Sequence, residues 1–313
     1  MRIVIVGPGA LGSLMTARLY LFQQKAGRAD NAVTSLHLLD YRPERAALLR
    51  KNGLFLEQRN QIVHCTPHVT SKPEVCLEAE VLFLCVKATA VSPALDGIRS
   101  YLSDKTLLVA MQNGIGHLEQ LARLAGPVGV GVTSEGATLT EPGHVRHGGS
   151  GRTLLGLLDP SSRYDQVLAQ GASLLDCAGI HAQVTDNPRK HVWAKLFVNV
   201  GINALTAVHG CLNGGLIQLP EAMVTMEKAI REAEQIACAQ DISIEVDPVQ
   251  TAVSVCKATA KNTSSMLQDI RRKRVTEIDA INGAVAAEGE RLGIPTPVNA
   301  ELVQRVKELE ASY

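Results

Sequence analysis

A glycine-rich turn directly after the first apolar segment is the feature that most constrains the fold of this chain. Residues 3–6 read as a short β-strand, and the sequence GPGALG that follows leads into a helical pattern over residues 13–20. In such a unit the first glycine permits the tight turn, the second lets the backbone approach a pyrophosphate, and the third allows close packing of helix on strand. The helix amino terminus then faces the negative charge. The cofactor-binding residues predicted from this motif are Gly7, Pro8, Gly9, Ala10, Leu11 and Gly12.

The remaining pattern predicts an α/β protein with two domains. Strands expected at residues 36–39, 81–86, 106–111 and 128–132, with shorter ones to residue 156, alternate with helical segments as in a parallel sheet. Residues 52–70 read as a small hairpin outside that sheet, turning at Arg59 and Asn60. Long helices are expected at residues 188–209, 221–240, 248–260, 265–291 and 298–311, the first with Asn187 as its N-cap. We predict a Rossmann-type dinucleotide-binding domain over residues 1–186 and an all-helical domain over residues 187–313.

Composition disfavours several classes of function. The 313 residues include 31 Lys and Arg against 31 Asp and Glu, so the chain offers no strong charge for nucleic acid or anionic lipid. No apolar stretch reaches the ~18 residues of a membrane span, and no signal peptide is recognisable. Seven cysteines without a CxxC motif are typical of free thiols in a reducing compartment, here expected to be the cytoplasm. The pairs His64 with His68 and His144 with His147 lack a third ligand, so no metal is expected.

The end of the second strand bears on the choice of nucleotide. An acid there would hydrogen-bond the ribose 2′-hydroxyl of NAD, whereas an arginine would accept the 2′-phosphate of NADP. Asp30 has nearly the expected spacing from the glycines but no strand before it, so Asp40 is the better candidate, with an insertion around residues 23–34. Arg42 and Arg45 follow closely. These residues alone leave NADPH and NADH open, and solvated loop charges are a further interpretation of the two arginines.

Two further polar residues directly follow apolar strands. Lys87 comes after the strand expected at residues 81–86, and Asn113 comes after the one expected at residues 106–111. In an open α/β sheet the carboxyl ends of the strands line the ligand crevice, so both side chains are predicted to contact a bound group. A surface loop for Lys87 and a plain turn for Asn113 are the structural alternatives.

The helix expected at residues 188–209 carries one polar stripe. Lys195, Asn199 and Asn203 recur every four residues among apolar neighbours. A helix that is apolar around the rest of its circumference is buried, and buried Lys and Asn side chains need partners. The stripe therefore predicts the wall of a site. Asparagines bonded to neighbouring helices beside a snorkelling lysine would be the structural alternative.

Together these segments resemble the ketopantoate reductase family over essentially the whole chain. The likeness rests on GPGALG at residues 7–12, RPER leading to NGL at 42–54, CVKA at 85–88, QNGIG at 112–116, KLFVNVGINALTAV at 195–208, NGG at 213–215, and SSMLQDI followed by TEIDAING at 264–283. The last three are specific to this family. The resemblance implies reduction of 2-dehydropantoate (ketopantoate) to (R)-pantoate with NADPH, a step of pantothenate and coenzyme A synthesis.

The resemblance also implies roles for single residues. It makes Lys195 the catalytic acid and Glu277 the carboxylate paired with it. Substrate binding is assigned to Asn199, Asn203, Asn213 and Ser265, and cofactor binding to Arg42 on the 2′-phosphate, Lys87 and Asn113. NADH stays possible because Asp40 would repel a 2′-phosphate unless Arg42 or Arg45 screens it.

Two alternatives stay open at this point. A reductase of the same build could act on another branched 2-oxo acid, because the shape of the pocket decides which chain fits. A redox sensor could bind NADPH and regulate a partner without turnover, although it would need only the first domain. The expected partner is a small 2-oxo acid, and the sequence leaves the oligomeric state open.

Overall fold

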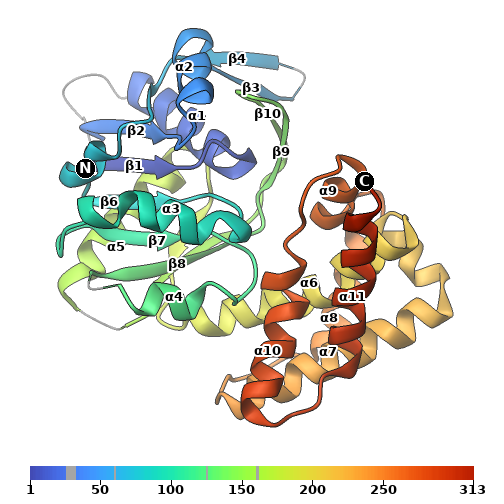
Figure 1. Cartoon of the computed structure of the whole chain (residues 1–313). Coiled ribbons are helices and arrows are strands. Elements are labelled where there is room, and N and C mark those ends of the chain that lie inside the picture. The colour runs from blue at the N-terminus through green and yellow to red at the C-terminus, as the bar shows by residue number, and fades with distance from the viewer. Residues whose placement is uncertain (26–32, 60, 125, 160–161) are drawn as a thin grey trace. The chain divides into compact units, whose positions relative to one another are not determined.

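The chain divides into two units. The structure, a computed structural model, describes residues 1–25, 33–59, 61–124, 126–159 and 162–313 (Figure 1). The first unit comprises Met1–Gln112 and Gln120–Pro188, and the second comprises Asn113–Glu119 and Arg189–Tyr313. The helical unit thus includes a short segment from the first half of the chain. Asp30, Asn60 and most of the expected insertion lie outside the described residues.

The first unit is built on an eight-stranded, mostly parallel sheet. In sheet order its strands are β12 (Ala182–Val184), β11 (Thr153–Leu157), β8 (Val128–Thr133), β7 (Leu107–Ala110), β6 (Val81–Leu84), β1 (Arg2–Val6), β2 (Ser35–Leu39) and β5 (His68–Thr70). Only the β8–β11 pair is antiparallel among the described strands of this sheet. β6 and β7 are buried at every residue, as expected for interior strands covered on both faces.

Helices and a second, smaller sheet complete this unit. The helices are α1 (Ala10–Lys25), α2 (Pro43–Asn52), α3 (Val91–Ile98), α4 (Leu118–Ala122, which begins in the segment shared with the helical unit) and α5 (Ser162–Cys177), with 3₁₀ turns η1 (Pro73–Glu78), η2 (Ala88–Ala90) and η3 (Arg99–Tyr101). The second sheet has the order β4 (Gln61–Cys65), β3 (Leu54–Gln58), β10 (His144–Gly149) and β9 (Gly136–Glu141). The hairpin expected at residues 52–70 is confirmed for β3 and β4, which pair antiparallel, and β10 extends it by pairing with β3. The end of that range was wrong, because β5 joins the main sheet beside β2.

The second unit is helical. Its elements are α6 (Pro188–His209), η4 (Asn213–Gln218), α7 (Pro220–Ala239), α8 (Pro248–Ala258), α9 (Ser265–Arg271), η5 (Ile278–Ala280), α10 (Asn282–Leu292) and α11 (Pro297–Ala311). Side chains of α6 such as Leu196, Val200 and Leu205 are almost fully buried and share one core with α7, α8, α10 and α11. The predicted fold class, a Rossmann-type domain followed by a helical one, is confirmed.

The single helix expected at residues 265–291 is wrong. α9 ends at Arg271, Lys273 has a left-handed φ of 52°, and the chain re-forms as η5 and then α10. The Thr276 hydroxyl accepts the backbone N–H of Ile278 at 3.2 Å and so stabilises the break. The spacing of the apolar residues suggested one helix because Ile278 and Val285 are both buried. In the structure Ile278 is buried from the turn η5 and Val285 from the helix α10. As a result Glu277 lies in a turn and not within a helix.

A largely buried polar network ties α6 to the start of α10 and α11. Asn282 Nδ2 donates to the Val200 carbonyl at 3.3 Å and to Asn299 Oδ1 at 3.0 Å. Asn299 Nδ2 donates in turn to the Ala229 carbonyl and to Glu232, whose carboxylate also accepts the backbone N–H groups of Val298 and Asn299. A buried amide left without partners costs ~1–3 kcal/mol, so this network fixes the register of α6 against its neighbours.

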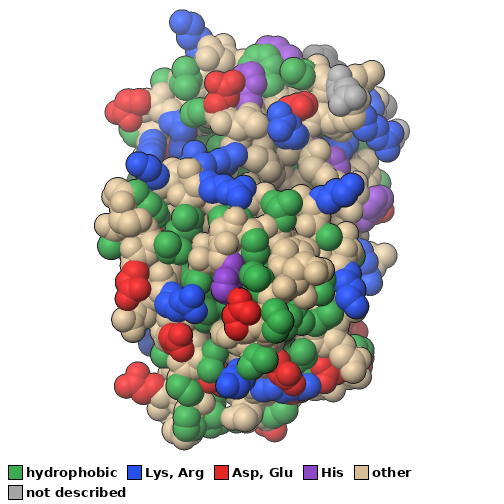
Figure 2. All heavy atoms as spheres, turned by 90° about the vertical axis from the view of Figure 1, so that its right-hand side faces the viewer, with side chains coloured by type: hydrophobic (Ala, Val, Ile, Leu, Met, Phe, Trp, Pro, Cys, Tyr) green, Lys and Arg blue, Asp and Glu red, His purple; other side chains and the backbone are tan. Residues whose placement is uncertain are grey.

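Three findings bear on the classes of function that composition disfavoured. Within the described ranges, the helices are all too short or too polar to cross a lipid bilayer. Figure 2 shows acidic and basic side chains mixed over one face of the molecule. The seven cysteines are all free thiols.

Candidate active site

In the glycine turn of the first unit, two glycines are required by close packing and one is not. Gly7 has a φ of +101°, and a Cβ atom on it would lie 2.9 Å from the Val86 nitrogen. A Cβ on Gly12 would lie 2.0 Å from the Gly7 carbonyl oxygen, so α1 could not approach the turn. Gly9 differs, because its nearest neighbour would be the Cys85 oxygen at 3.7 Å, an ordinary contact. The protein's own packing demands glycine at positions 7 and 12, and the open space at Gly9 fits the approach of a pyrophosphate.

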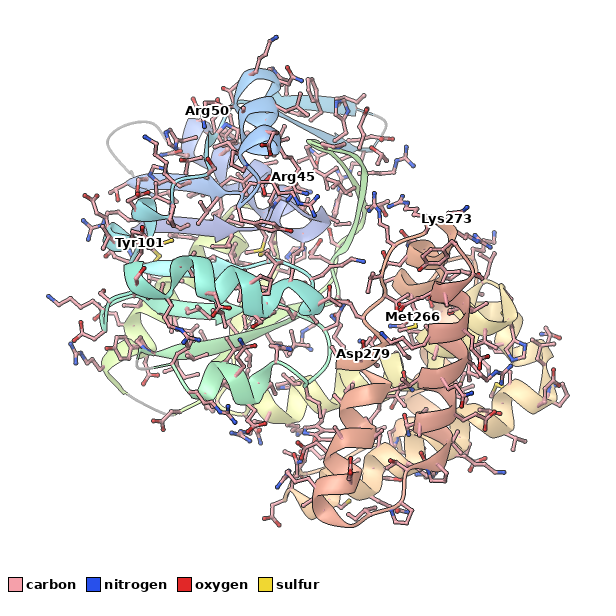
Figure 3. All side chains as sticks on the ribbon, viewed as in Figure 1. Arg45, Arg50, Tyr101, Met266, Lys273 and Asp279 are labelled. Atoms are coloured by element: carbon pink, nitrogen blue, oxygen red, sulfur yellow. The ribbon has the colours of Figure 1, made fainter. Side chains whose placement is uncertain are left out.

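Asp40 follows β2 directly, as the sequence indicated, and its carboxylate is fully buried. Arg45 lies on α2, where Figure 3 labels it. It donates to both oxygens of Asp40, from Nε at 2.5 Å and from Nη2 at 2.8 Å. The backbone N–H of Arg42 adds a third bond to Oδ1 at 3.1 Å. The hydrogen bonds that Asp40 accepts from Arg45 raise the pKa of the Arg45 guanidinium above its ordinary value. Arg42 is exposed, and among the residues that the structure describes no carboxylate pairs with its guanidinium.

Lys87 and Gln112 lie at the carboxyl ends of neighbouring strands in this unit. Lys87 is exposed at the residue before η2. Gln112, which the sequence analysis did not single out, donates from Nε2 to the carbonyls of Leu84 and Val86 at 2.7 and 3.0 Å. Its Oε1 is buried and has no partner among the described residues. The sequence pointed to Gln112 only as the first residue of the motif QNGIG, directly before Asn113.

In the second unit, Asn113 and Glu277 meet although 164 positions separate them. Asn113 Nδ2 donates to Glu277 Oε2 at 3.0 Å. The contact depends on the next residue, because Gly114 has a φ of +82° and a Cβ on it would lie 2.0 Å from the Ala280 oxygen. The backbone N–H of Ile115 donates to the same oxygen at 3.1 Å. The segment Asn113–Glu119 therefore packs on η5, the turn that directly follows Glu277. Asn113, predicted for the cofactor, orients the carboxylate here.

Lys195 lies on α6 and is partly buried. Burial lowers the pKa of its ammonium to about 8, and the negative charge of Glu277 opposes that shift. Since the desolvation of a cation and the attraction of a carboxylate act in opposite directions, the lower value means that desolvation dominates. An ammonium with a pKa near 8 is still mostly charged at pH 7 and is a stronger acid than an exposed lysine.

Asn199 and Asn203 extend the polar stripe of α6 from Lys195. Their side-chain amides form no hydrogen bond with any described residue. Asn203 is only 6% exposed, and the small surface that it exposes includes its unbonded amide. Amides that are unbonded within the protein and still open to solvent are available to a polar ligand in contact with this stripe. The alternative of asparagines bonded to neighbouring helices is wrong for these two residues within the described chain.

Asn213 and Ser265 are linked to the same region through backbone and hydroxyl contacts. Asn213 Nδ2 donates to Thr259 Oγ1 at 2.9 Å, whereas its Oδ1 is buried without a partner among the described residues. Thr206, three residues beyond Asn203 on α6, donates to Ser264 Oγ at 2.7 Å. Ser264 caps α9 and is thereby occupied, which leaves the exposed hydroxyl of Ser265 for a ligand. Ser265 thus presents a hydroxyl that a ligand can reach, whereas the unpartnered oxygen of Asn213 is enclosed by protein.

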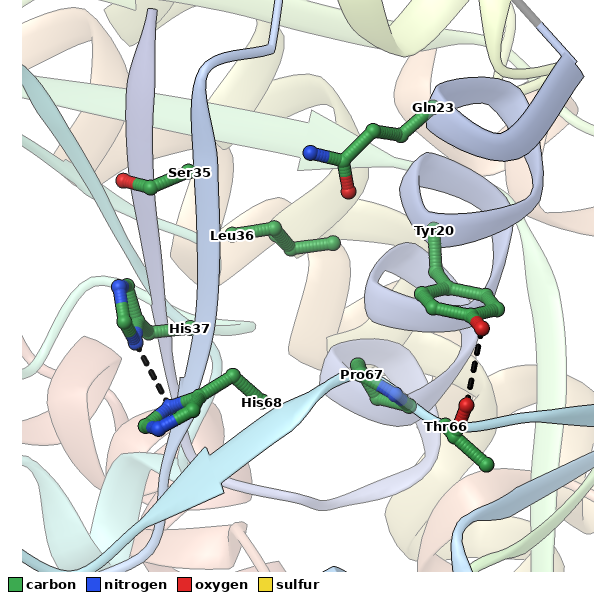
Figure 4. Close-up of a pocket in the computed structure, with 8 residues that line it drawn as sticks. All are labelled: Tyr20, Gln23, Ser35, Leu36, His37, Thr66, Pro67 and His68. Carbon is green, nitrogen blue, oxygen red and sulfur yellow. Dashed lines mark hydrogen bonds between the residues drawn. The ribbon is translucent and has the colours of Figure 1, made fainter.

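The first unit also has a pocket of about 260 Å³, which lies apart from the glycine turn (Figure 4). It is lined by residues of α1, by the beginning of β2 and by the segment before β5. The glycine turn lies at the carboxyl end of β1, whereas the beginning of β2 pairs with the beginning of β1, so the pocket and the turn lie at opposite ends of these strands.

Two histidines of the pairs considered as metal ligands have other partners, because His68 hydrogen-bonds His37 and His147 hydrogen-bonds Glu135. The described residues contain no group of three metal-ligating side chains.

Comparison with known proteins identifies the family. The family model "Ketopantoate reductase PanE/ApbA" matches residues 3–160, and "Ketopantoate reductase PanE/ApbA C terminal" matches residues 187–310. A 2-dehydropantoate 2-reductase of Halobacterium salinarum is 34% identical over 98% of both chains. The chain belongs to the ketopantoate reductase family. The resemblance inferred from the sequence motifs is therefore confirmed.

Solved structures of two differently named proteins share the whole fold. A PanE/ApbA family ketopantoate reductase from Ralstonia eutropha JMP134 superposes with a TM-score of 0.87 at 27% identity, covering 100% of this chain and 99% of that one. A D-mandelate dehydrogenase bound to NADH and anilino(oxo)acetate has a TM-score of 0.86 at 26% identity, with the same coverage. Because these two proteins have different names and the same fold, the substrate has to be argued from the residues.

We predict that Gly114→Ala lowers kcat/KM by at least ~10-fold, because the new Cβ must push Asn113 away from Glu277. Gly293→Ala is the matched control. Gly293 also has a positive φ, of +70°, but a Cβ added there would have no atom within 4 Å. It should lose stability in thermal unfolding without a comparable loss of activity. Equal losses of kcat/KM in the two variants would contradict the role given to the Asn113 turn.

Proposed function

We propose that this protein is a 2-dehydropantoate 2-reductase that uses NADPH. The observation that carries the proposal is the lysine of α6, whose pKa is lowered to about 8 beside the carboxylate of Glu277. Family membership and relatives named 2-dehydropantoate 2-reductase support the same conclusion. The glycine turn, with its open space at Gly9, supports a dinucleotide as the cofactor.

The chain's own residues divide the work of reducing a 2-oxo acid. A bound nicotinamide dinucleotide supplies the hydride. Lys195 donates a proton to the carbonyl oxygen as negative charge develops there, and its lowered pKa makes it a better donor. Glu277, held by Asn113, orients the ammonium and keeps it charged. The Lys195 amine then regains a proton from solvent before the next turnover.

Asparagines suit a substrate with hydroxyl groups. Their amides can donate and accept without adding charge, so Asn199 and Asn203 bind the polar groups of the substrate chain. The exposed Ser265 hydroxyl donates to the carboxylate, and a hydroxyl of the bound substrate would satisfy the buried Oδ1 of Asn213. Ketopantoate carries a hydroxyl, a carbonyl and a carboxylate, which this set of donors and acceptors matches.

The nucleotide is proposed to be NADPH, with Arg42 on the 2′-phosphate. Arg42 is exposed directly after β2, and no described carboxylate neutralises it. Lys87 lies at the end of β6 in the same unit. An arginine at this strand end is the usual partner of a 2′-phosphate. A pure redox sensor is disfavoured, because it would not need the Lys195, Asn199 and Asn203 side chains of the helical unit to bind or reduce a substrate.

The second candidate is a reductase of another 2-oxo acid that uses NADH, which the likeness to D-mandelate dehydrogenase with NADH favours. We predict faster reduction of ketopantoate than of phenylglyoxylate, the oxo acid of mandelate, and a higher kcat/KM with NADPH than with NADH. Nucleotide oxidation followed by absorbance in the four combinations measures this. Preference for phenylglyoxylate would overturn the substrate, and equal use of both nucleotides would overturn the cofactor.

Lys195→Ala should lower kcat by at least ~10²-fold while NADPH binding survives, because the variant loses the proton donor and keeps the glycine turn. Lys190→Ala is the matched control, since Lys190 lies on the same helix and pairs with Glu245. It should keep kcat within about 2-fold of the parent protein. Turnover retained in Lys195→Ala would reject the catalytic assignment.

The pH dependence follows from the direction of the Lys195 shift. The ammonium is present below its pKa of about 8 and is lost above it, so kcat/KM should fall as the pH rises through 8. Glu277 raises this pKa, so Glu277→Gln should move the falling limb to lower pH. The check is a pH–rate profile of both proteins with ketopantoate. A limb above pH 10, or an unmoved limb in the variant, would contradict the assignment.

A further inference from the structure

The end of β2 holds an acid that the usual rule would assign to NAD. An Asp at this position ordinarily accepts a hydrogen bond from the ribose 2′-hydroxyl and repels a 2′-phosphate. Asp40 lies there, and its backbone N–H donates to the Thr70 carbonyl of β5 at 3.0 Å. By that rule alone the chain would be expected to prefer NADH. The contacts of the carboxylate argue against it.

Both carboxylate oxygens of Asp40 are already occupied. Arg45 holds them side-on through Nε and Nη2, and the Arg42 backbone N–H adds a third donor. The carboxylate has no exposed surface, whereas the Arg45 side chain is 28% exposed. A ribose hydroxyl would therefore have to reach a buried group and displace a charge-assisted, bidentate bond.

The charge at this strand end follows from the same contacts. Asp40 and Arg45 cancel, which leaves the exposed guanidinium of Arg42 as the uncompensated charge of the three residues. Tyr41 lies beside both arginines, with its ring centroid 5.5 Å from the Arg42 carbon and 6.0 Å from the Arg45 carbon. Of these three residues the net charge is positive in spite of the acid, with Glu44 as a further exposed acid in the first turn of α2. The exposed guanidinium of Arg42 is a charge that favours a ligand with an extra phosphate.

We propose that Arg45 is a positioning residue that sets nucleotide specificity by masking Asp40. It need not contact the nucleotide itself, because it acts by removing the carboxylate that would otherwise bind a 2′-hydroxyl and repel a 2′-phosphate. The inference rests on the proposed use of a nicotinamide dinucleotide by this unit. It adds the reason why an aspartate at the end of β2 is compatible with NADPH.

The test is nucleotide binding in the absence of any 2-oxo acid. Dissociation constants for NADPH and NADH are measured by calorimetry on the full chain for Arg45→Met, Asp40→Asn and the double variant. Arg45→Met should bind NADPH at least ~10-fold more weakly, because the bare carboxylate repels the phosphate, with NADH within ~3-fold of the parent. Asp40→Asn added to Arg45→Met should restore NADPH binding to within ~3-fold of the parent protein.

Two comparisons distinguish masking from direct contact and from damage. Arg42→Ala should lose NADPH affinity whether or not Asp40→Asn is present, since Arg42 is the residue expected to meet the phosphate. Lys51→Met removes an exposed charge from the same helix and should change neither constant by more than about 2-fold. A double variant as weak as Arg45→Met would overturn the masking role, and so would equal weakening of both nucleotides in Arg45→Met.

The test remains decisive if the Arg45→Met variant fails to fold. Arg45→Met leaves a buried carboxylate unpaired, which is strongly destabilising, whereas the double variant removes both charges. If only the double variant folds, NADPH binding within ~3-fold of the parent supports masking, and a loss beyond ~10-fold overturns it. Because no 2-oxo acid is present, a protein that shows these constants but reduces no 2-oxo acid would overturn the proposed function and keep this inference.

Discussion

The site depends on one electrostatic balance, between the desolvation of the Lys195 ammonium and the attraction of the Glu277 carboxylate. Burial alone would drive the lysine towards its neutral form, and a carboxylate alone would make it a poor acid. Together they give a pKa of about 8 in place of the ordinary 10.5. The balance requires that α6 and the turn before η5 stay in register, since the attraction between the two charges falls as the distance between them grows.

That register is held from two sides. The Asn113 turn is seated on η5 through the close approach of Gly114 to the Ala280 oxygen, and Asn113 fixes the carboxylate. On the other side, Asn282 donates to the carbonyl of Val200, the residue directly after Asn199 on α6. Asn299 and Glu232 complete this second support. A buried polar network of this kind specifies one arrangement, because any slip leaves several amides without partners.

The sequence predicted much of this architecture for simple physical reasons. Period-2 and period-3.6 patterns, the glycine turn and the four-residue spacing of Lys195, Asn199 and Asn203 are local signals, and they placed β1, α1 and α6 correctly. The family motifs supplied Glu277, Asn213 and Ser265. The pattern alone could not distinguish asparagines that bond within the protein from those open to a ligand, because Asn282 and Asn203 both lie in buried positions. Only the contacts show that Asn282 is bonded within the described chain and that Asn203 is not.

What the sequence did not predict depends on contacts between distant residues. The break after α9 was hidden because a turn can bury the same apolar residues that a helix would. Nothing local indicates that Asn113–Glu119 packs with the helical unit, or that β10 pairs with β3. The pairing of Asp40 with Arg45 was one of several ways to screen the acid, and only geometry could select it. Contacts between distant residues place the side chains of the proposed site, whereas local patterns place the helices and strands that carry them.

The most direct test of this account is the titration of the Lys195 amine itself. In protein labelled with ¹⁵N at lysine side chains, with Lys195→Ala to assign the signal, the Nζ resonance should titrate with a pKa near 8. In Glu277→Gln the same signal should titrate at lower pH, because the charge that favours the ammonium is gone. A Lys195 pKa above 10, as for a lysine in water, would contradict the central claim.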